Sequence, residues 1–289
     1  MKRLNRQLIK LLEMETVDLA GYLAGKLTEL YGDAVKYATE DYIFAEGNIP
    51  VMLVAHMDTV FSNPPKVQVL TDGILTSNKG LGADDRAGIF AILKIIDDGY
   101  RPYILFTNDE EIGCIGARKF VDRLVDDDVT INVNFLIELD RKGKKDAVFY
   151  DCDNRKFQRF IESYGFKTAY GSFTDICVIA PVVGAAAVNL SVGYYRQHTH
   201  GELLIVSELM ETIRKVKTIL DSNTKHYEYV SAYVDNVNTW DLSTFGKLSL
   251  GKKKYTEVLT ESFDDDTIEA QIARYTGYQM DMDDYQIDW

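Results

Sequence analysis

The sequence predicts an α/β protein with a mostly parallel, mixed central sheet and helices on both faces. Segments with apolar residues at helical spacing alternate along the chain with short segments that are continuously apolar. Continuously apolar strands are typical of parallel sheets, because the connecting helices bury both faces of the sheet. In such folds the functional site lies beyond the carboxyl ends of the strands.

The expected elements follow one another in chain order. Residues 1–31 carry leucines at helical spacing and predict two amphipathic helices. Residues 41–48 and 50–55 predict successive strands, and residues 66–77 predict a hairpin that turns at Asp72 and Gly73. The later segments predict a helix over 84–99, a strand over 102–107, a helix over 114–125, strands over 133–139 and 147–151, a helix over 154–165, a strand over 185–193 and a long helix over 202–222.

Composition excludes several classes of protein. The net charge of -13 argues against nucleic acid as a partner, and most of it lies in residues 255–289, which hold ten acids and one arginine. No apolar run is long enough to span a membrane or to form a signal peptide, so we expect a cytoplasmic protein without membrane partners. The three separated cysteines, Cys114, Cys152 and Cys177, favour a reducing compartment and argue against a disulfide framework.

Acids and histidines follow the ends of the predicted strands. These residues are His56 and Asp58, Asp84 and Asp85, Glu110 and Glu111, Glu138 and Asp140, and His198 and His200. Any one of them has a structural explanation, such as a helix cap or a solvated acid. Together they would place many carboxylates at one edge of the sheet, where protons, bases or cations must neutralise them. Mixed histidine and carboxylate ligands suit zinc, and two cations bridged by one carboxylate would use the additional acids.

Five motifs resemble those of the co-catalytic di-zinc exopeptidase superfamily, most closely its zinc aminopeptidase and tripeptidase-like branch. They are AHMDTV (55–60), GADDRAG (82–88), NDEEIGCIGA (108–117), ELD (138–140) and a final histidine, and they cover residues 43–200. The resemblance implies a single zinc-exopeptidase-like catalytic domain. It also implies two divalent metal ions per chain, Zn²⁺ with Co²⁺ or Mn²⁺ as alternatives.

The resemblance assigns a role to each motif residue. His56, Asp84 and Asp140 would bind one metal, and Asp84, Glu111 and His198 the other, while Asp58 orients His56 and Glu110 acts as general base. Three alternatives remain open: Asp85 in place of Asp84, Glu138 in place of Asp140, and His200 in place of His198. Residues on the substrate side would be Asp175, Tyr195 and His200.

The expected function is a zinc-dependent aminopeptidase that hydrolyses short peptides. The alternatives are an N-acyl amino acid amidohydrolase or carboxypeptidase with the same metals, a one-zinc cyclase of N-terminal glutamine, and a non-catalytic scaffold. The second set of ligands argues against the last two. We expect a catalytic domain over residues 1–222 without an inserted lid or dimerisation domain. Residues 223–289 form an acidic extension with aromatic residues, including Tyr275, Tyr278, Tyr285 and Trp289, which docks on the domain or on a second copy in a homo-oligomer, or remains a solvated tail.

Overall fold

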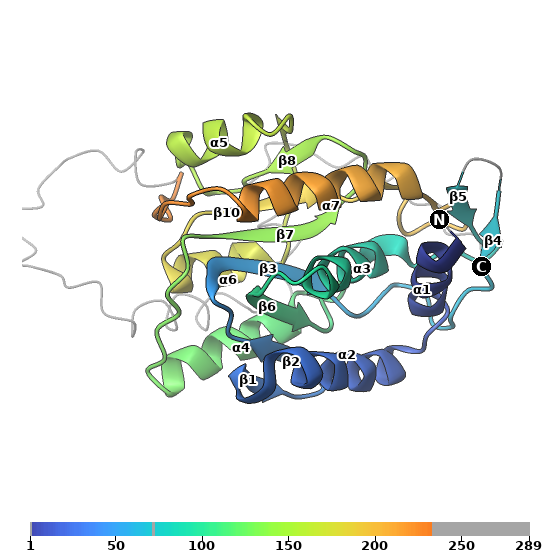
Figure 1. The fold of residues 1–289 in the computed structure, drawn as a ribbon, viewed down its shortest axis with the longest axis horizontal. Coiled ribbons are helices and arrows are strands. Elements are labelled where there is room, and N and C mark those ends of the chain that lie inside the picture. The colour runs from blue at the N-terminus through green and yellow to red at the C-terminus, as the bar shows by residue number, and fades with distance from the viewer. Residues whose placement is uncertain (1, 71–72, 233–289) are drawn as a thin grey trace, which may run out of the picture. The chain divides into compact units, whose positions relative to one another are not determined.

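The central sheet follows the predicted α/β architecture. The computed structural model describes residues 2–70 and 73–232, and Figure 1 shows their arrangement. Among these residues, eight strands form the central sheet, and a separate sheet of four strands is described below. In spatial order they are β1 (Val35–Ala38), β2 (Tyr42–Ala45), β6 (Pro102–Thr107), β3 (Ile49–His56), β7 (Phe135–Arg141), β10 (Ala187–Ser191), β8 (Asp146–Val148) and β9 (Lys167–Ala169).

The middle of this sheet is parallel, and an antiparallel strand joins it on each side. Strands β6, β3, β7 and β10 run in the same direction, so their carboxyl ends meet at one edge. Strand β2 is antiparallel to β6, and β8 is antiparallel to β10. The predicted mixed sheet in a single α/β domain is therefore confirmed.

Helices cover both faces because the buried strands carry apolar side chains on both. Leu53 of β3 packs in one cluster, whereas its neighbours Met52 and Val54 pack in the other, as the two-residue period of a strand requires. Helices α1, α2, α3, α5 and α7 contribute to the first cluster and α4 and α6 to the second. Their bounds are α1 (Lys2–Leu12), α2 (Thr16–Tyr31), α3 (Ala83–Asp97), α4 (Ile115–Asp126), α5 (Arg155–Glu162), α6 (Asp175–Val183) and α7 (Val206–Leu220), with a short 3-10 helix η1 at Gly32–Ala34.

A second sheet of four strands corrects one prediction. Its order is β11 (Tyr194–Tyr195), β12 (Leu203–Ile205), β5 (Ile74–Thr76) and β4 (Gln68–Val69). The predicted hairpin is confirmed as β4 and β5, with residues 71–72 of its turn outside the described residues. The helix predicted from residue 202 is wrong over its first turn, because Leu203–Ile205 pair with β5 and the helix begins at Val206.

The chain beyond α7 continues along the domain. The backbone N–H of Ala186 donates to the carbonyl of Tyr227 at 2.7 Å, and that of Asp153 donates to Val230 at 2.7 Å. These bonds attach the first part of the predicted extension to the residue before β10 and to the loop after β8. The predicted docking aromatics from Tyr275 to Trp289 lie outside the described residues.

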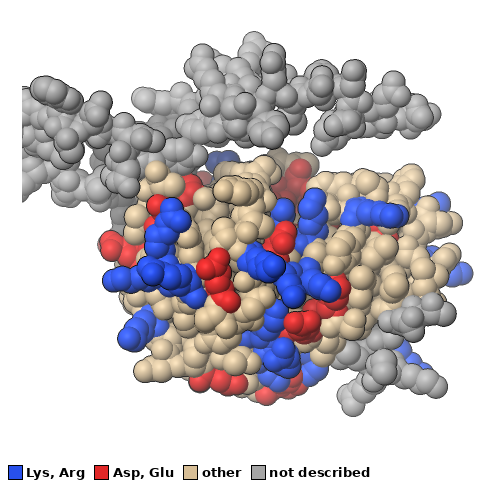
Figure 2. Space-filling model, turned by 90° about the horizontal axis from the view of Figure 1, so that it is seen from above, with Lys and Arg blue, Asp and Glu red and all other residues tan. Residues whose placement is uncertain are grey.

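The face over α5 and α7 carries both signs of charge. Figure 2 shows lysine and arginine side chains interspersed with aspartate and glutamate on this face. Mixed charge of this kind does not form the continuous basic surface by which proteins bind nucleic acid. Among the described residues, no helix has the length and apolar character needed to traverse a bilayer.

Candidate metal centre

The residues predicted to bind metal, together with the predicted orienting acid Asp58 and general base Glu110, lie at the carboxyl edge of the parallel strands. They come from several segments: His56 at the end of β3, Asp58 after it, Asp84 in the first turn of α3, Glu110 and Glu111 after β6, Asp140 in β7, and His198 between β11 and β12. Strand β3 lies between β6 and β7, and His56 is in register with Thr107, the last residue of β6. The sheet order therefore brings the histidine and the two acidic segments side by side.

The His56 imidazole is buried and surrounded by three carboxylates. Its Nδ1 lies 3.2 Å from an oxygen of Asp58, and its Nε2 lies 3.2 Å from Oδ1 of Asp84 and 3.6 Å from Oδ1 of Asp140. Burial lowers the pKa of His56, but these carboxylates outweigh it and raise the pKa well above the ordinary value. The ring therefore points Nδ1 at Asp58 and Nε2 at the carboxylate oxygens of Asp84 and Asp140.

His198 faces the other oxygen of the same aspartate. Its Nε2 lies 3.2 Å from Oδ2 of Asp84 and 3.0 Å from Glu111, and these contacts raise its pKa to about 10. Asp84 therefore presents one oxygen to each imidazole. The pair of histidines lowers the pKa of Asp84, although burial acts in the opposite direction. Two donor sets result, His56–Asp84–Asp140 and His198–Asp84–Glu111, which share one carboxylate.

Asp85 is the alternative to Asp84, and distance alone does not separate them. Donor atoms of His56, Asp85 and Asp140 lie within 4.8 Å of one another, as do those of His56, Asp84 and Glu111. Both oxygens of Asp85 accept backbone hydrogen bonds, from His56 N–H at 3.3 Å and from Gly88 N–H at 2.9 Å. We therefore favour Asp84 as the shared ligand, with Asp85 fixing the backbone around it.

Asp140 and Glu138 lie on one face of β7 but have different neighbours. The hydroxyl of Tyr194 donates to Asp140 Oδ1 at 3.1 Å, and the amide of Asn189 lies 3.4 Å from Oδ2. Burial, then the charge of Asp84, raises the pKa of Asp140 to about 7. Glu138 Oε2 is buried and accepts no hydrogen bond from the described residues. Only Asp140 of the two has an ion-pair contact with His56 in this part of the chain.

Asp58 holds the loop of the two glutamates as well as His56. Its Oδ1 accepts from the backbone N–H of Glu110 at 3.1 Å, and its Oδ2 accepts from that of Glu111 at 3.1 Å. Burial favours the neutral acid, but His56 and the two N–H groups outweigh it and lower the pKa of Asp58. One carboxylate thus fixes the orientation of a ligand from each donor set.

The carboxyl group of Glu110 has a pKa well above its ordinary value. Burial first, and then the charges of Asp140, Asp175 and Glu111, raise its pKa to about 9, against an opposing effect of His56. Its Oε1 accepts a weak hydrogen bond from the thiol of Cys114 at 3.8 Å. A carboxyl group with few hydrogen-bond partners and a raised pKa beside a metal centre is suited to exchange a proton.

Asp175, at the start of α6, contacts Thr107, the last residue of the strand that precedes the Glu110 loop. It is fully buried, its Oδ2 accepts a short hydrogen bond from Thr107, and its Oδ1 accepts none from the described residues. Burial is the first cause that raises its pKa, to about 6. Asp175 is therefore enclosed away from solvent and attached to the end of β6.

Two predicted substrate-side residues are not brought into the donor sets. The hydroxyl of Tyr195 donates to Glu208 at 2.6 Å, and His200 is exposed in the turn after His198. Two supporting residues, Asn189 and Glu202, were missed by the sequence analysis, and the contact of Tyr194 with Asp140 was not predicted either. Each acts on a ligand far away in the chain, so no local spacing indicates it.

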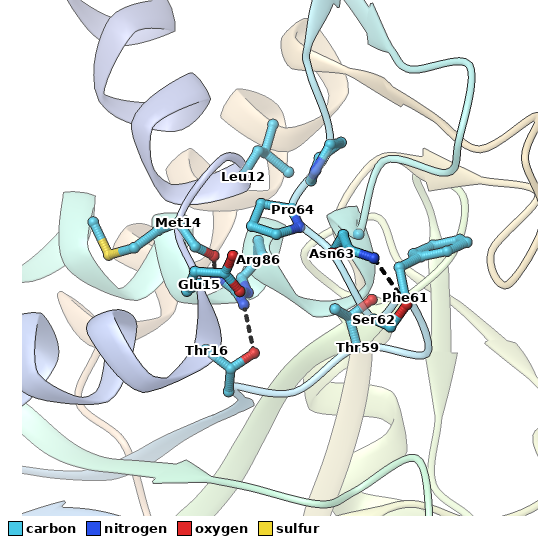
Figure 3. Close-up of a pocket in the computed structure, with 12 residues that line it drawn as sticks. Leu12, Met14, Glu15, Thr16, Thr59, Phe61, Ser62, Asn63, Pro64 and Arg86 are labelled. Atoms are coloured by element: carbon cyan, nitrogen blue, oxygen red, sulfur yellow. Dashed lines mark hydrogen bonds between the residues drawn. The ribbon is translucent and has the colours of Figure 1, made fainter.

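A hollow beside the candidate metal centre is lined by residues other than those of the centre. About 350 Å³ of open space lies between the corner of α1 and α2 and the loop after Asp58 (Figure 3). Arg86 lies beneath it and donates to the carbonyls of Leu11 and Met14 and to the hydroxyl of Thr16 at 3.0, 3.0 and 3.1 Å. None of the metal-ligand candidates lines this hollow. Its buried arginine connects the two N-terminal helices to α3.

Comparison with known proteins agrees with the motifs. The model of peptidase family M28 matches residues 43–175, which include every ligand candidate except His198. No curated protein matches the sequence. The match supports the resemblance to co-catalytic zinc exopeptidases and the prediction of a peptide hydrolase.

Solved structures show the same fold. The aminopeptidase PepT of Bacillus cereus and a tripeptidase of Staphylococcus aureus are 18% and 16% identical to the chain, each with a TM-score of 0.59. Each alignment covers 76% of this chain and 97% of the other. A TET aminopeptidase of a marine sediment Thaumarchaeota archaeon is 14% identical, with a TM-score of 0.61 and coverage of 77% and 97%.

Proposed function

We propose that this chain, a peptide hydrolase of the co-catalytic zinc exopeptidase superfamily, is a two-metal aminopeptidase that removes N-terminal residues from short peptides. The observation that carries the proposal is the position of Asp84, with one oxygen 3.2 Å from His56 and the other 3.2 Å from His198. A carboxylate placed in this way can serve two cations at once, and imidazole nitrogen with carboxylate oxygen is the donor set that zinc accepts.

The side chains fit two divalent ions in number and in charge. His56 and Asp140 would hold one ion, His198 and Glu111 the other, and Asp84 both. When bound, two such ions polarise a scissile carbonyl and lower the pKa of an attacking water. Asp58 would keep the Nε2 of His56 free to bind, because its own contact is with Nδ1 at 3.2 Å.

Glu110 would act as the general base of the reaction. Its loop is fixed by Asp58, so its carboxylate stays at the same edge of the sheet as both donor sets. Cations nearby favour an ionised carboxylate, which would lower the pKa of Glu110 from its metal-free value. The ionised group would accept a proton from the attacking water and deliver it to the leaving amine.

The charge of the site favours a substrate with a free amino group. Among residues 2–70 and 73–232, no lysine or arginine forms an ion pair with a carboxylate of the two donor sets. An N-acyl amino acid or the C-terminus of a peptide would bring a carboxylate, which calls for a basic partner. An N-terminal ammonium group has no such requirement.

A substrate panel tests this function. The zinc-loaded full-length chain is assayed with leucine-p-nitroanilide and leucyl-glycyl-glycine, and in parallel with N-acetyl-leucine and a peptide with a blocked N-terminus. We expect release of free leucine from the first two only, and its loss in Glu110→Gln. Cleavage of the acylated substrates alone would assign the amidohydrolase or carboxypeptidase activity, and no cleavage of any substrate would contradict both.

A further inference from the structure

Glu202 is a buried carboxylate that the metal centre does not use directly. It has no exposed surface, and it precedes β12, four residues after His198. A buried glutamate is rare unless it is paired or hydrogen-bonded. Its partners therefore indicate its role.

All of its described side-chain partners are backbone N–H groups at the start of α3. Oε2 accepts from Leu81 at 3.0 Å and from Gly82 at 2.7 Å, and Oε1 accepts from Asp84 at 3.1 Å. These N–H groups need acceptors from outside the helix, because Asp84 and Asp85 have non-helical torsion angles and the N-cap residue, Gly82, has no side chain. Glu202 supplies them from a segment 118 to 121 residues away.

The same residue is fixed on the side of His198. The backbone N–H of Glu202 donates to the carbonyl of Thr199 at 3.1 Å, which closes the turn that directly follows His198. Its own carbonyl accepts from the hydroxyl of Thr76 at 3.1 Å, and the next residue, Leu203, pairs with Thr76 in β5. Glu202 thus connects the turn of one ligand to the backbone of another.

We propose that Glu202 is a positioning residue for the metal centre: its carboxylate holds Asp84 and the His198 turn in the relation that the shared-ligand site requires. This inference rests on the proposed two-metal function. His198 has 48% of its side chain exposed and gains little support from packing. The distance between His198 and Asp84 therefore depends on the backbone connection through Glu202. The distance between His56 and Asp84 depends on it less, because the strand that carries His56 is buried in the sheet.

Glu202→Gln separates positioning from packing, because glutamine has the same shape. A carboxylate offers two acceptor oxygens, whereas an amide offers one oxygen and one N–H₂ donor. If the amide oxygen keeps Leu81 and Gly82, the N–H₂ group faces the N–H of Asp84 and that hydrogen bond is lost. The opposite orientation loses two bonds, so the variant's main defect should fall on the shared ligand.

The experiment is a Zn²⁺ titration of the metal-free full-length chain by calorimetry. It is combined with a thermal melt without metal and with turnover of leucine-p-nitroanilide at limiting and excess Zn²⁺. For Glu202→Gln we expect the weaker zinc affinity to fall by about 10–100-fold, the range found when a residue that orients a ligand is changed. Excess Zn²⁺ should restore most of kcat, and the absorption spectrum of the Co²⁺-loaded variant should differ from that of the wild type. Glu29→Gln, at a glutamate of α2 with 69% of its side chain exposed, is the matched control and should behave as wild type.

Three results would overturn the inference. Unchanged affinity for both zinc ions in Glu202→Gln would show that Asp84 needs no such support. Equal weakening of both ions with a lower melting temperature, and no recovery in excess Zn²⁺, would assign Glu202 to fold stability alone. No zinc binding by the wild type would contradict the two-metal function itself, and with it the role of Glu202.

Discussion

Glu110→Gln should abolish activity and at the same time stabilise the metal-free protein. In the fold, burial and neighbouring acids raise the pKa of Glu110 from 4.5 to about 9. At pH 7 the folded protein therefore carries the neutral acid, whereas the unfolded chain carries the carboxylate. Glutamine has the shape of the neutral acid and cannot ionise, so it removes the preference of this residue for the unfolded state.

The magnitude follows from the two pKa values. Ionisation favours the unfolded chain over the interval from 4.5 to 7, about 2.5 pH units at about 1.4 kcal/mol each, which is about 3 kcal/mol. For a domain of this size, that gain would raise the melting temperature by about 6 to 12 °C. It should vanish below pH 4.5, where both states are protonated. In the opposite direction, loss of a general base should lower kcat by about 10²- to 10⁴-fold.

The assay compares wild type, Glu110→Gln and the exposed control Glu29→Gln. Thermal melts of the chelator-treated proteins at pH 4.5 and 7 give the stability, mass spectrometry of zinc-loaded protein gives the metal content, and peptide turnover gives kcat. We expect unchanged zinc content in Glu110→Gln. A variant that turns over peptide at the wild-type rate would refute the assigned base. A metal-free variant no more stable than wild type at pH 7 would refute the protonated environment of Glu110.

Three further predictions concern the metal ligands. Asp84→Asn should lower the zinc content from about two ions per chain toward one, because the shared carboxylate is lost; mass spectrometry after gel filtration measures it, and retention of both ions would exclude Asp84 as the bridge. Asp58→Asn should weaken zinc binding by about 10–100-fold in calorimetry, since an amide cannot accept from both His56 and the two N–H groups that Asp58 now holds; wild-type affinity would count against this orienting role. Metal-free protein should lose stability as pH rises from 6.5 toward about 10, because the raised pKa of His198 gives stability that is fully present below 6.5 and is lost through the folded pKa. Saturating Zn²⁺ should flatten that profile, and melts whose temperature rises over this range would contradict the assignment.

The fold and the positions of most site residues could be predicted because their signals are local. Residues 51–55 are a continuous apolar run that becomes the buried centre of β3, and His56 follows directly at its end. The two-residue period of a strand returns Asp58 to the side of His56, and their 3.2 Å contact has that origin. A strand end followed by ligand-type residues thus indicates both the fold and the edge at which the site forms.

The first strand residues before α7 and the supporting contacts of the site could not be predicted, because the residues they contact are distant in the chain. From the sequence, residues 203–205 fit the start of the long helix, since a short apolar run fits either a helix or a strand. They form a strand because they pair with β5, which lies far away in the chain. Glu202 is one acid in a polar turn, and only the fold brings it to the N–H groups of Leu81, Gly82 and Asp84. Likewise, the hydrogen bonds of Asn189 and Tyr194 to Asp140 depend on sheet order, which residue spacing does not encode.

The excess of acids links the stability of the fold to its activity. Without a cation, the pKa values of Glu110, Asp140 and Asp175 rise to about 9, 7 and 6, so the folded protein keeps protons that the unfolded chain releases. A divalent ion that binds only the folded state displaces those protons, and at a concentration 1,000 times its Kd it stabilises the fold by about 4 kcal/mol. Zinc binding should therefore be stronger at higher pH, over the same range in which the metal-free protein becomes less stable. Two of the carboxylates that destabilise the empty fold, Glu110 and Asp140, are thus also groups whose ionised forms the proposed two-metal reaction would require.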